Sequence, residues 1–366
     1  MIQIAKPAIS EDAMDRVRTV LESGMLADGP EVRAFEDEFS AFCGTEYGIA
    51  TSNGTTALEA TLRAFDIGRG DRVLTTPFSF VATANAIRLA GAEPVFSDVD
   101  PQTFNLDPEA AEAVAREADV DAILTVHLYG LPSEMDALAD LAADLDVPLI
   151  EDAAQAHGAE YRGERVGSLG DAACFSFYPT KNMTTGEGGM VTTDRDDVDE
   201  RVRSFINHGR DVGADGDGGG TYDHVRLGTN DRMTSVAAAI GRTQLERLDE
   251  FTAARRENAA RLTDGLAKNE GIETPIEPAQ MKHVYHQYTI RTEDREGLMA
   301  HLADHDVGSS VYYPTPIHEQ PAFDGVTTSA PAAESAATEV LSLPVHPAIT
   351  YSEVDTIVEV TNAHGE

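Results

Sequence analysis

Lysine is scarce in this sequence, and positive charge in general is in short supply. The 366 residues include 27 basic side chains, of which four are lysines and twenty-three are arginines, against 64 acidic ones. The formal net charge is −37 at pH 7. Such a protein repels phosphate groups, whose attraction dominates general binding to nucleic acids and anionic membranes. The composition therefore excludes general electrostatic binding to DNA, RNA or a membrane surface.

The excess of acidic residues is spread along the whole chain and is not gathered in a tail. Together with the scarcity of lysine, this distribution is typical of a surface adapted to high salt. Salt at high concentration screens charges beyond a few Å, so neighbouring carboxylates repel one another less. We therefore expect a halophilic protein whose stability increases with salt concentration.

Cysteine and long apolar runs are also nearly absent. The two cysteines, Cys43 and Cys174, are too few for a disulfide framework. Cys174 lies in the apolar run Ala172–Phe177 and is predicted to be a small buried side chain. No apolar run reaches the roughly 20 residues that span a membrane, and the segment Met1–Pro7 lacks the pattern of a signal peptide. We expect a cytoplasmic protein.

Short apolar runs alternate with segments of helical periodicity between residues 45 and 195. The runs predicted to be strands are Tyr47–Thr51, Arg72–Thr76, Glu93–Ser97, Ala122–Val126, Pro148–Glu151, Ala172–Phe177 and Met190–Thr193. The predicted helices are Thr55–Phe65, Val81–Ala90, Pro108–Ala118 and Met135–Asp144. This alternation predicts an α/β fold with a mostly parallel, doubly wound sheet. Ligands of such sheets bind beyond the carboxyl ends of the strands.

The chain length predicts about two domains. The segment Thr234–Asn258 is predicted to be a long, nearly continuous helix leading out of the first domain. A second alternation follows, with segments at Val284–Ile290, Leu298–Asp304, Gly308–Tyr313 and Val354–Asn362. We expect an N-terminal arm and large domain over residues 1–245 and a smaller α/β domain over residues 246–366. The stretch Val212–Gly220 is predicted to be a linker, because it lacks the glutamate that ends a calcium loop.

One of the four lysines, Lys181, lies where apolar chain should bury it. It follows the apolar run Ala172–Phe177 and precedes the glycine-rich turn Gly186–Gly189. Burial lowers the pKa of an amine, and Schiff-base chemistry requires a neutral amine. The alternative is a surface lysine without a catalytic role, which describes most lysines. The apolar neighbourhood favours the first interpretation.

The stretch Thr51–Thr56 joins a predicted strand to a predicted helix and contains Gly54 and Thr55. Free backbone N–H groups and the positive end of the helix dipole would face a phosphate there. Capping of the helix by Ser52 or Thr55 explains the pattern about as well. The stretch is not a Walker loop, because no lysine follows it.

Asp152 comes directly after the apolar strand Pro148–Glu151. A carboxylate at this point is desolvated unless it has a cationic partner. A protonated pyridine nitrogen is such a partner, and a carboxylate beside it keeps the ring an acceptor of electrons. The alternative is that Asp152 caps the next helix.

Two further residues lie at predicted strand ends. Phe80 can stack on a flat ring, although a lone aromatic residue is more often part of the core. Ser176 precedes Lys181 by five residues, so its hydroxyl can reach the same phosphate. A phosphate cradle, a strand-end acid, a stacking ring and a lysine in one strand–helix domain together describe a site for pyridoxal phosphate.

Short motifs along nearly the whole chain occur in the same order in one known family. They are Gly29–Val32, Ser52–Thr55, Phe78–Thr83, Pro94–Asp100, His127–Gly130, Glu151–Gly158, Ser176–Asn182, Gly186–Gly189, Asn207–Gly209, Asn230–Met233, Tyr313–His318 and Leu341–Pro344. On these motifs the chain resembles the DegT/StrS-type sugar-nucleotide aminotransferases, which are fold-type-I pyridoxal-phosphate enzymes.

The resemblance implies a role for each matching residue. Lys181 would form the internal aldimine with pyridoxal phosphate, Asp152 would pair with the pyridine nitrogen, and Gln155 would lie beside the ring hydroxyl. Phe80 would cover the ring face. The residues implied to hold the phosphate are Gly54, Thr55, Ser176 and, from the neighbouring subunit of a homodimer, Asn230. The residues implied on the substrate side are Arg232, Tyr313 and His318.

The resemblance also implies a reaction. An amino group would pass from an amino acid, glutamate in the family, through pyridoxamine phosphate to a keto sugar linked to a nucleotide, in amino-sugar and polysaccharide biosynthesis. The loop Thr184–Met190 is similar to that of perosamine-type 4-aminotransferases and favours a 4-keto-6-deoxy sugar. Tyr312 stands where many members carry histidine, which leaves sugar recognition open.

Three alternatives remain open. A dehydratase on the same scaffold carries histidine in place of the lysine, and Lys181 argues against it. A non-catalytic regulator would show a broken cofactor site or a basic DNA-reading element, and neither is visible. A zinc enzyme would need more than His283 and His286, which have no cysteine pair or third ligand nearby in sequence, so we expect no metal.

Overall fold

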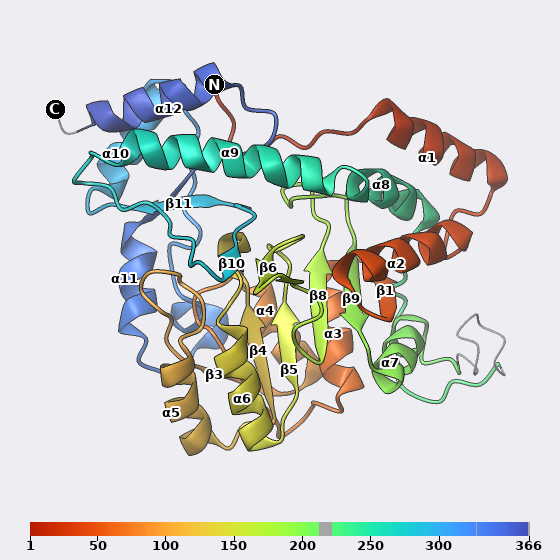
Figure 1. Cartoon of the computed structure of the whole chain (residues 1–366). Coiled ribbons are helices and arrows are strands. Elements are labelled where there is room, and N and C mark those ends of the chain that lie inside the picture. The colour runs from red at the N-terminus through yellow and green to blue at the C-terminus, as the bar shows by residue number, and fades with distance from the viewer. Residues whose placement is uncertain (212–221, 327, 365–366) are drawn as a thin grey trace.

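The computed structural model describes residues 1–211, 222–326 and 328–364 (Figure 1). The predicted linker Val212–Gly220 lies outside the described residues. The helices are α1 (Glu11–Ser23), α2 (Pro30–Cys43), α3 (Gly54–Ala64), α4 (Ala82–Ala90), α5 (Pro108–Ala118), α6 (Met135–Leu145), α7 (Asp196–Ile206), α8 (Ser235–Leu245), α9 (Leu248–Leu266), α10 (Arg295–Asp304), α11 (Pro331–Glu339) and α12 (Tyr351–Ala363). The strands are β1 (Tyr47–Thr51), β2 (Arg72–Thr75), β3 (Glu93–Phe96), β4 (Ala122–Val126), β5 (Leu149–Asp152), β6 (Glu160–Tyr161), β7 (Glu164–Arg165), β8 (Ala172–Ser176), β9 (Gly189–Thr193), β10 (Met281–Lys282), β11 (Tyr288–Arg291) and β12 (Val340–Leu343).

A seven-stranded sheet runs through the centre of the molecule, in the order β1-β9-β8-β5-β4-β2-β3. Neighbouring strands are parallel from β8 to β3, while β9 is antiparallel to both β8 and β1. The predicted mostly parallel α/β sheet is confirmed, and its seven strands correspond to the seven predicted runs. The carboxyl ends of its parallel strands point toward α9 (Figure 1).

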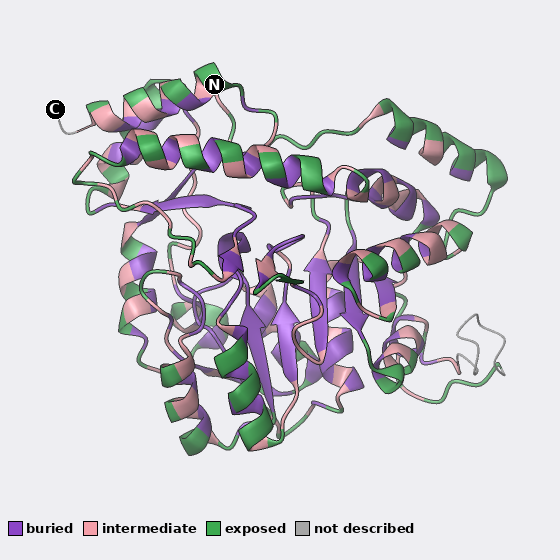
Figure 2. Ribbon diagram, in the orientation of Figure 1, coloured by how far each residue is buried: buried purple, intermediate pink, exposed green. Residues whose placement is uncertain are grey.

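Helices cover both faces of this sheet because successive side chains of a strand point to opposite faces. In β4, Leu124 packs with α3, α4 and α7, while Ile123 packs with α5 and α6. In β8, Cys174 packs into the first of these layers, and Phe175 packs with α2 and α8. Cys174 is buried and free, as predicted. The central strands are accordingly buried along most of their length (Figure 2).

The C-terminal part of the chain forms a smaller core. β11 pairs antiparallel with β12, and α9, α10 and α12 pack around this two-stranded sheet. The first residues of the chain contact this part, since Ile2 forms a parallel bridge with Val307. The smaller α/β unit is therefore present, whereas the domain boundary at residue 245 stays a prediction.

The long, nearly continuous helix expected over Thr234–Asn258 is interrupted once, between α8 and α9. Glu246 and Arg247 form a turn between α8 and α9, in which the Arg247 N–H donates to the Gln244 carbonyl oxygen at 3.1 Å. The apolar periodicity continues across this turn, so the pattern could not reveal it.

Within the segment Gly308–Tyr313, Ser310 forms an isolated bridge with Ser342, and the segment is not part of a regular strand. The true partner of β11 is β12, which the sequence did not indicate. No helix in the described part of the chain is long and apolar enough to cross a lipid bilayer.

Candidate active site

A cavity of about 940 Å³ lies at the carboxyl ends of the parallel strands. Its walls come from the turns after β1 and β2, from the ends of β5 and β8, and from two C-terminal segments. The residues that line it include Asn53, Gly54, Thr55, Phe80, Thr83, Asp152, Gln155, Ser176, Lys181, His286, Tyr312 and Tyr313. Eight of the eleven predicted site residues therefore border one space.

The turn between β1 and α3 presents backbone donors to this cavity. Asn53 caps α3, since its side-chain oxygen accepts a hydrogen bond from the Thr56 N–H at 2.9 Å. The alternative of a cap by Ser52 or Thr55 is therefore wrong. The N–H groups of Gly54 and Thr55 lie in the first turn, where a helix offers them no acceptor.

The same turn approaches the end of β8 closely. A Cβ atom built on Gly54 would lie 2.7 Å from the Cβ of Ser176, so the approach requires glycine. The Ser176 hydroxyl lies at the cavity, 3.4 Å from the Tyr178 N–H. Free N–H groups at a helix N-terminus, with a hydroxyl opposite, form a cradle for a phosphate.

Asp152 ends β5 and is only 4 % exposed. The residues that follow it form turns and then β6, so the helix-cap alternative is wrong. Thr83 Oγ1 donates to Oδ2 at 2.7 Å, and the Ala154 N–H donates to Oδ1 at 3.2 Å. Burial raises the pKa of Asp152, and the Thr83 hydrogen bond and the charge of Lys181 oppose that rise. A cationic ring nitrogen in the cavity would stabilise this carboxylate.

Gln155 is held in one orientation by the loop after β4. Its Oε1 accepts a hydrogen bond from the Tyr129 N–H at 2.8 Å. Its Nε2 group consequently points the other way and donates to the Tyr313 hydroxyl at 3.2 Å. The amide therefore presents its N–H donor to the cavity, where an oxygen on a ligand ring can accept a hydrogen bond from it.

Lys181 lies half-buried in the loop after β8, where its N–H donates to the Tyr178 carbonyl oxygen at 2.9 Å. Burial lowers the pKa of its amine to about 8, and the charge of Asp152 opposes that shift. With this pKa, about a tenth of the amine is neutral at pH 7. Lys181 and Asp152 border the same cavity and are electrostatically coupled.

Two buried histidines lie close to Lys181. His286 Nδ1 lies 3.1 Å from Oδ1 of Asn182, and the ring of His157 packs against two phenylalanines. Burial and the charge of Lys181 lower the pKa of both rings, that of His157 to about 3. Both imidazoles are therefore neutral near pH 7 and add no positive charge beside the lysine.

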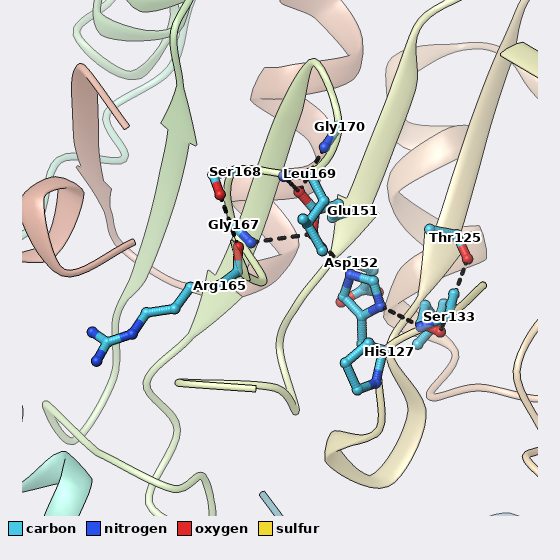
Figure 3. A network of polar contacts seen from close by, with 12 residues as sticks. Thr125, His127, Ser133, Glu151, Asp152, Arg165, Gly167, Ser168, Leu169 and Gly170 are labelled. Atoms are coloured by element: carbon cyan, nitrogen blue, oxygen red, sulfur yellow. Dashed lines mark hydrogen bonds and ion pairs between the residues drawn. The ribbon is translucent and has the colours of Figure 1, made fainter. Parts of the chain in front are cut away.

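The end of β5 is anchored by the buried carboxylate of Glu151 (Figure 3). Its Oε1 accepts hydrogen bonds from the N–H groups of Leu169 and Gly170, each at 2.9 Å. Its Oε2 accepts one from Gly167 at 3.1 Å and lies 2.9 Å from Nε2 of His127. This network fixes the end of β5, which carries Asp152, to the loops before β8 and after β4.

Phe80 is 54 % exposed, so the alternative of a core aromatic residue is wrong. Its ring lies 6.1 Å from the ring of Tyr313, at an interplanar angle of 37°. An exposed ring at the rim of the cavity is available to cover a flat ligand.

Three predicted residues lie outside this lining. Asn230 is exposed, and its Oδ1 accepts a hydrogen bond from Arg232 Nη2 at 2.7 Å. Their segment lies at the cavity edge, because the Ser52 N–H donates to the Asp231 carbonyl oxygen at 2.7 Å. His318 lies farther away, with Nε2 3.4 Å from a glutamate of α11. A single chain does not bring these three side chains into the cavity.

The two candidate zinc ligands, His283 and His286, have different partners and do not form a metal site with other described residues. The His283 ring stacks on Tyr285 with centroids 3.9 Å apart, and His286 bonds Asn182. Within the described ranges, the side chains close enough to share an ion are His318, Glu319 and Glu334.

Comparison with known proteins identifies the family. The model of the DegT/DnrJ/EryC1/StrS aminotransferase family matches residues 7–362. This chain belongs to that family. A pleiotropic regulatory protein of Geobacillus stearothermophilus is 41 % identical over 93 % of this chain and 91 % of its own length. The UDP-2-acetamido-2-deoxy-3-oxo-D-glucuronate aminotransferase of Pseudomonas aeruginosa is 39 % identical, over 93 % and 92 % respectively.

A solved structure has the same fold over nearly the whole chain. The crystal structure of DesV of S. venezuelae, in complex with a ketimine intermediate, matches with a TM-score of 0.91 at 35 % identity and covers 98 % of each chain. Pyridoxal phosphate is the cofactor of this family. The Gly54–Ser176 cradle, the buried Asp152 carboxylate and the Lys181 amine all fit that group.

Sequence reasoning missed several residues that shape this site. Thr83 and Tyr129 lie inside motifs shared with the DegT/DnrJ/EryC1/StrS family, but their partners are 69 and 26 residues away. The shared motifs were the available signal. Asn53, which caps α3, also lies inside a shared motif.

Proposed function

We propose that this protein is a pyridoxal-phosphate-dependent aminotransferase that transfers an amino group from an amino acid, glutamate by family resemblance, to a nucleotide-linked keto sugar. Its product would serve amino-sugar and polysaccharide biosynthesis, in the cytoplasm. The observation that carries the proposal is one cavity that joins the Lys181 amine, the Asp152 carboxylate and the Gln155 amide.

Each residue would hold a different part of the cofactor. Lys181 Nζ would bond its aldehyde carbon, Asp152 its ring nitrogen, and the Gln155 Nε2 its ring oxygen. Phe80 would cover the ring face, and the residues that would hold the phosphate are Gly54, Thr55 and Ser176. The cofactor, when bound, supplies a ring that withdraws electrons from the carbon next to the amine.

Lys181 would have a second task once the amino donor is bound. Its freed Nζ would take the proton from the donor's α-carbon and return it to a neighbouring carbon. A pKa of about 8 lets the amine both accept and release a proton near neutral pH. Because His157 and His286 are neutral, they add no positive charge beside this amine.

Two other functions are less well supported. The presence of Lys181, in place of histidine, argues against a dehydratase. The similarity to a pleiotropic regulatory protein suggests a non-catalytic role as the second alternative. The complete set of Lys181, Asp152 and Gln155 at one cavity favours catalysis.

The ketone carbon of the sugar is a separate part of the proposal. The relative from Pseudomonas aeruginosa is named for a 3-oxo sugar. Its similarity over nearly the whole chain favours carbon 3 over the carbon 4 that the loop Thr184–Met190 suggested.

We also propose a homodimer in which Asn230 completes the phosphate site of the partner subunit. Asn230 is exposed at the edge of its own cavity, and its side chain accepts a hydrogen bond from Arg232, which does not line that cavity. Exposed apolar side chains on and just after α1 support a partner surface, and they are Met14, Leu21, Met25 and Leu26.

Mixing Lys181→Ala and Asn230→Asp chains tests the shared site. Each variant alone should be inactive, and an equal mixture should recover about a quarter of the wild-type activity, because half of the dimers hold one intact site.

The function itself is tested by incubating the purified enzyme with glutamate and UDP- or dTDP-linked 3-keto and 4-keto sugars. We expect 2-oxoglutarate and an amino sugar in equal amounts, detected by mass spectrometry, and neither product with Lys181→Ala. Cofactor-loaded wild-type enzyme that makes no amino sugar from any of these substrates would contradict the proposal.

A further inference from the structure

A second cavity, of about 190 Å³, uses the Lys181 loop as one of its walls. Its other walls are the N-terminal segment Ala5–Ala8, the helices α8 and α9, and the pair Pro347–Ala348. Thr180 and Lys181 border both this cavity and the candidate active site. A ligand here would therefore lie next to the lysine proposed to be catalytic.

Arg255, on α9, lines this cavity and is only 5 % exposed. Its Nη1 donates to the carbonyl oxygens of Tyr285 and His286, at 3.1 and 3.3 Å. Its Nε is buried without a hydrogen-bond partner among the described residues, and its Nη2 makes no hydrogen bond to any of them. The guanidinium therefore keeps donors that no described residue accepts.

No acidic side chain among the described residues balances this charge. Burial lowers the pKa of Arg255 to about 10, and no carboxylate opposes that shift. The acidic residue in the cavity wall, Glu250, is paired with Arg247 at 3.0 Å. Lys6 lines the cavity as well. A buried cation without a counter-ion is costly, yet it occurs in a chain with 64 acidic residues.

Two neighbours of Arg255 also have unused polar atoms. Thr252 Oγ1, one turn earlier on α9, and His346 Nδ1 are buried without a partner among the described residues. Burial and the charge of Arg255 lower the pKa of His346 to about 4, which places its ring within electrostatic reach of the guanidinium. Two further unsatisfied polar atoms therefore lie near Arg255.

We propose that this second cavity binds a small carboxylate at the guanidinium of Arg255. A guanidinium and a carboxylate form charge-assisted hydrogen bonds, which are stronger than those between neutral groups. Lys6 adds a second positive charge at the cavity wall. The bound anion would favour the protonated form of Lys181 and so couple the concentration of a small acid to the state of that amine.

Calorimetric titration of the holoenzyme with sodium formate, at constant ionic strength, tests the proposal. Wild-type enzyme should bind formate saturably, and its cofactor absorbance should change with the same midpoint. Arg255→Lys should weaken binding by about tenfold, and Arg255→Gln should abolish it. Arg256→Gln is the matched control, because Arg256 is the next residue on α9 but pairs with Glu277; it should bind formate like the wild type.

Three results would overturn the proposal. The first is no saturable binding to wild-type enzyme, in which case water fills the cavity. The second is equal formate affinity in wild type and Arg255→Gln. If Arg255→Gln does not fold, the equivalent result is an unchanged formate affinity in both Arg255→Lys and Lys6→Gln. The third is chloride or phosphate binding as tightly as formate, which would make the site one for inorganic anions.

Discussion

His127 and Glu151 form a fully buried pair in which Nε2 of the histidine lies 2.9 Å from Oε2 of the glutamate. The geometry decides the tautomer. Nδ1 of His127 accepts a hydrogen bond from the Ser133 N–H at 3.0 Å, so the proton of a neutral ring is on Nε2 and is donated to Glu151. The carboxylate therefore receives four hydrogen bonds, three of them from backbone N–H groups.

Glu151→Gln should destabilise the protein strongly. The glutamine amide would place its NH₂ group, a donor, against backbone N–H donors that bond a carboxylate oxygen in the wild type. Breaking such a buried charged network costs about 2–4 kcal/mol of folding stability. Urea unfolding followed by circular dichroism measures the change. Glu164→Gln, at an exposed position of β7, is the control and should unfold like the wild type. Equal midpoints for all three proteins would show that the network contributes little.

Reaction of the cofactor-free enzyme with pyridoxal phosphate should accelerate with pH. Only the neutral amine of Lys181 attacks the aldehyde, and its pKa of about 8 makes the neutral fraction rise about tenfold between pH 7 and pH 9. The rate, followed by visible absorbance, should level off above pH 9. Lys268→Ala, which changes an exposed lysine, should behave like the wild type, and Lys181→Ala should not react. A rate that climbs without a plateau to pH 10.5 would mean that the amine has an ordinary pKa.

Asp152→Asn should lower transamination by at least about 100-fold, since the amide cannot stabilise a protonated ring nitrogen. Thr83→Val should have a smaller effect, of about tenfold, because it removes one hydrogen bond but keeps the charge. Steady-state rates with saturating glutamate compare the two. Cofactor binding, checked by absorbance, should persist in both variants. An Asp152→Asn enzyme with wild-type turnover would remove the carboxylate from the mechanism.

Gly54→Ala should weaken cofactor binding. The added Cβ would lie 2.7 Å from Ser176 Cβ and push α3 away from β8, at a cost of about 1–3 kcal/mol. Fluorescence titration of the cofactor-free variant measures the affinity. Gly68→Ala is a suitable control, because its Cβ would meet a carbonyl oxygen only at 3.6 Å. If both variants bind the cofactor equally, the close approach does not shape the phosphate site.

The melting temperature should rise with salt. Sixty-four acidic residues against 27 basic ones repel one another in dilute buffer, and screening removes part of that repulsion. Between 0.1 and 2 M KCl we expect an increase of at least about 5 °C in thermal unfolding. Sucrose solutions serve as the uncharged comparison. A stability maximum in dilute buffer would refute adaptation to high salt.

The local pattern of the chain was sufficient for the central sheet. Each of its seven strands is a short apolar run between turn residues, and each lies within about two residues of its predicted bounds. The same pattern was not sufficient for β12, because a four-residue strand buried on both faces has no alternation to distinguish it. Nor could it locate the turn at Glu246 and Arg247, where apolar periodicity continues without interruption.

The site was predicted to a similar degree and for the same reason. Lys181, Asp152 and Gly54 stand next to strand ends or helix starts, so their chemistry could be inferred from a few neighbouring residues. The partners that orient them could not, since Thr83 bonds Asp152 across 69 residues. The structure also excluded one alternative at each of two positions. Asn53 caps α3 in place of Ser52 or Thr55, and Phe80 is exposed and not part of the core.

The sequence by itself determined the family, the α/β sheet and the scarce lysine in an apolar setting, because these depend on residue order and short-range periodicity. Only the tertiary structure decided that eight of the predicted side chains meet at one cavity and that Asn230, Arg232 and His318 do not. It also revealed the unpaired Arg255 behind the Lys181 loop. Burial, desolvation and the absence of a counter-charge arise from packing between distant segments, and no local pattern encodes them.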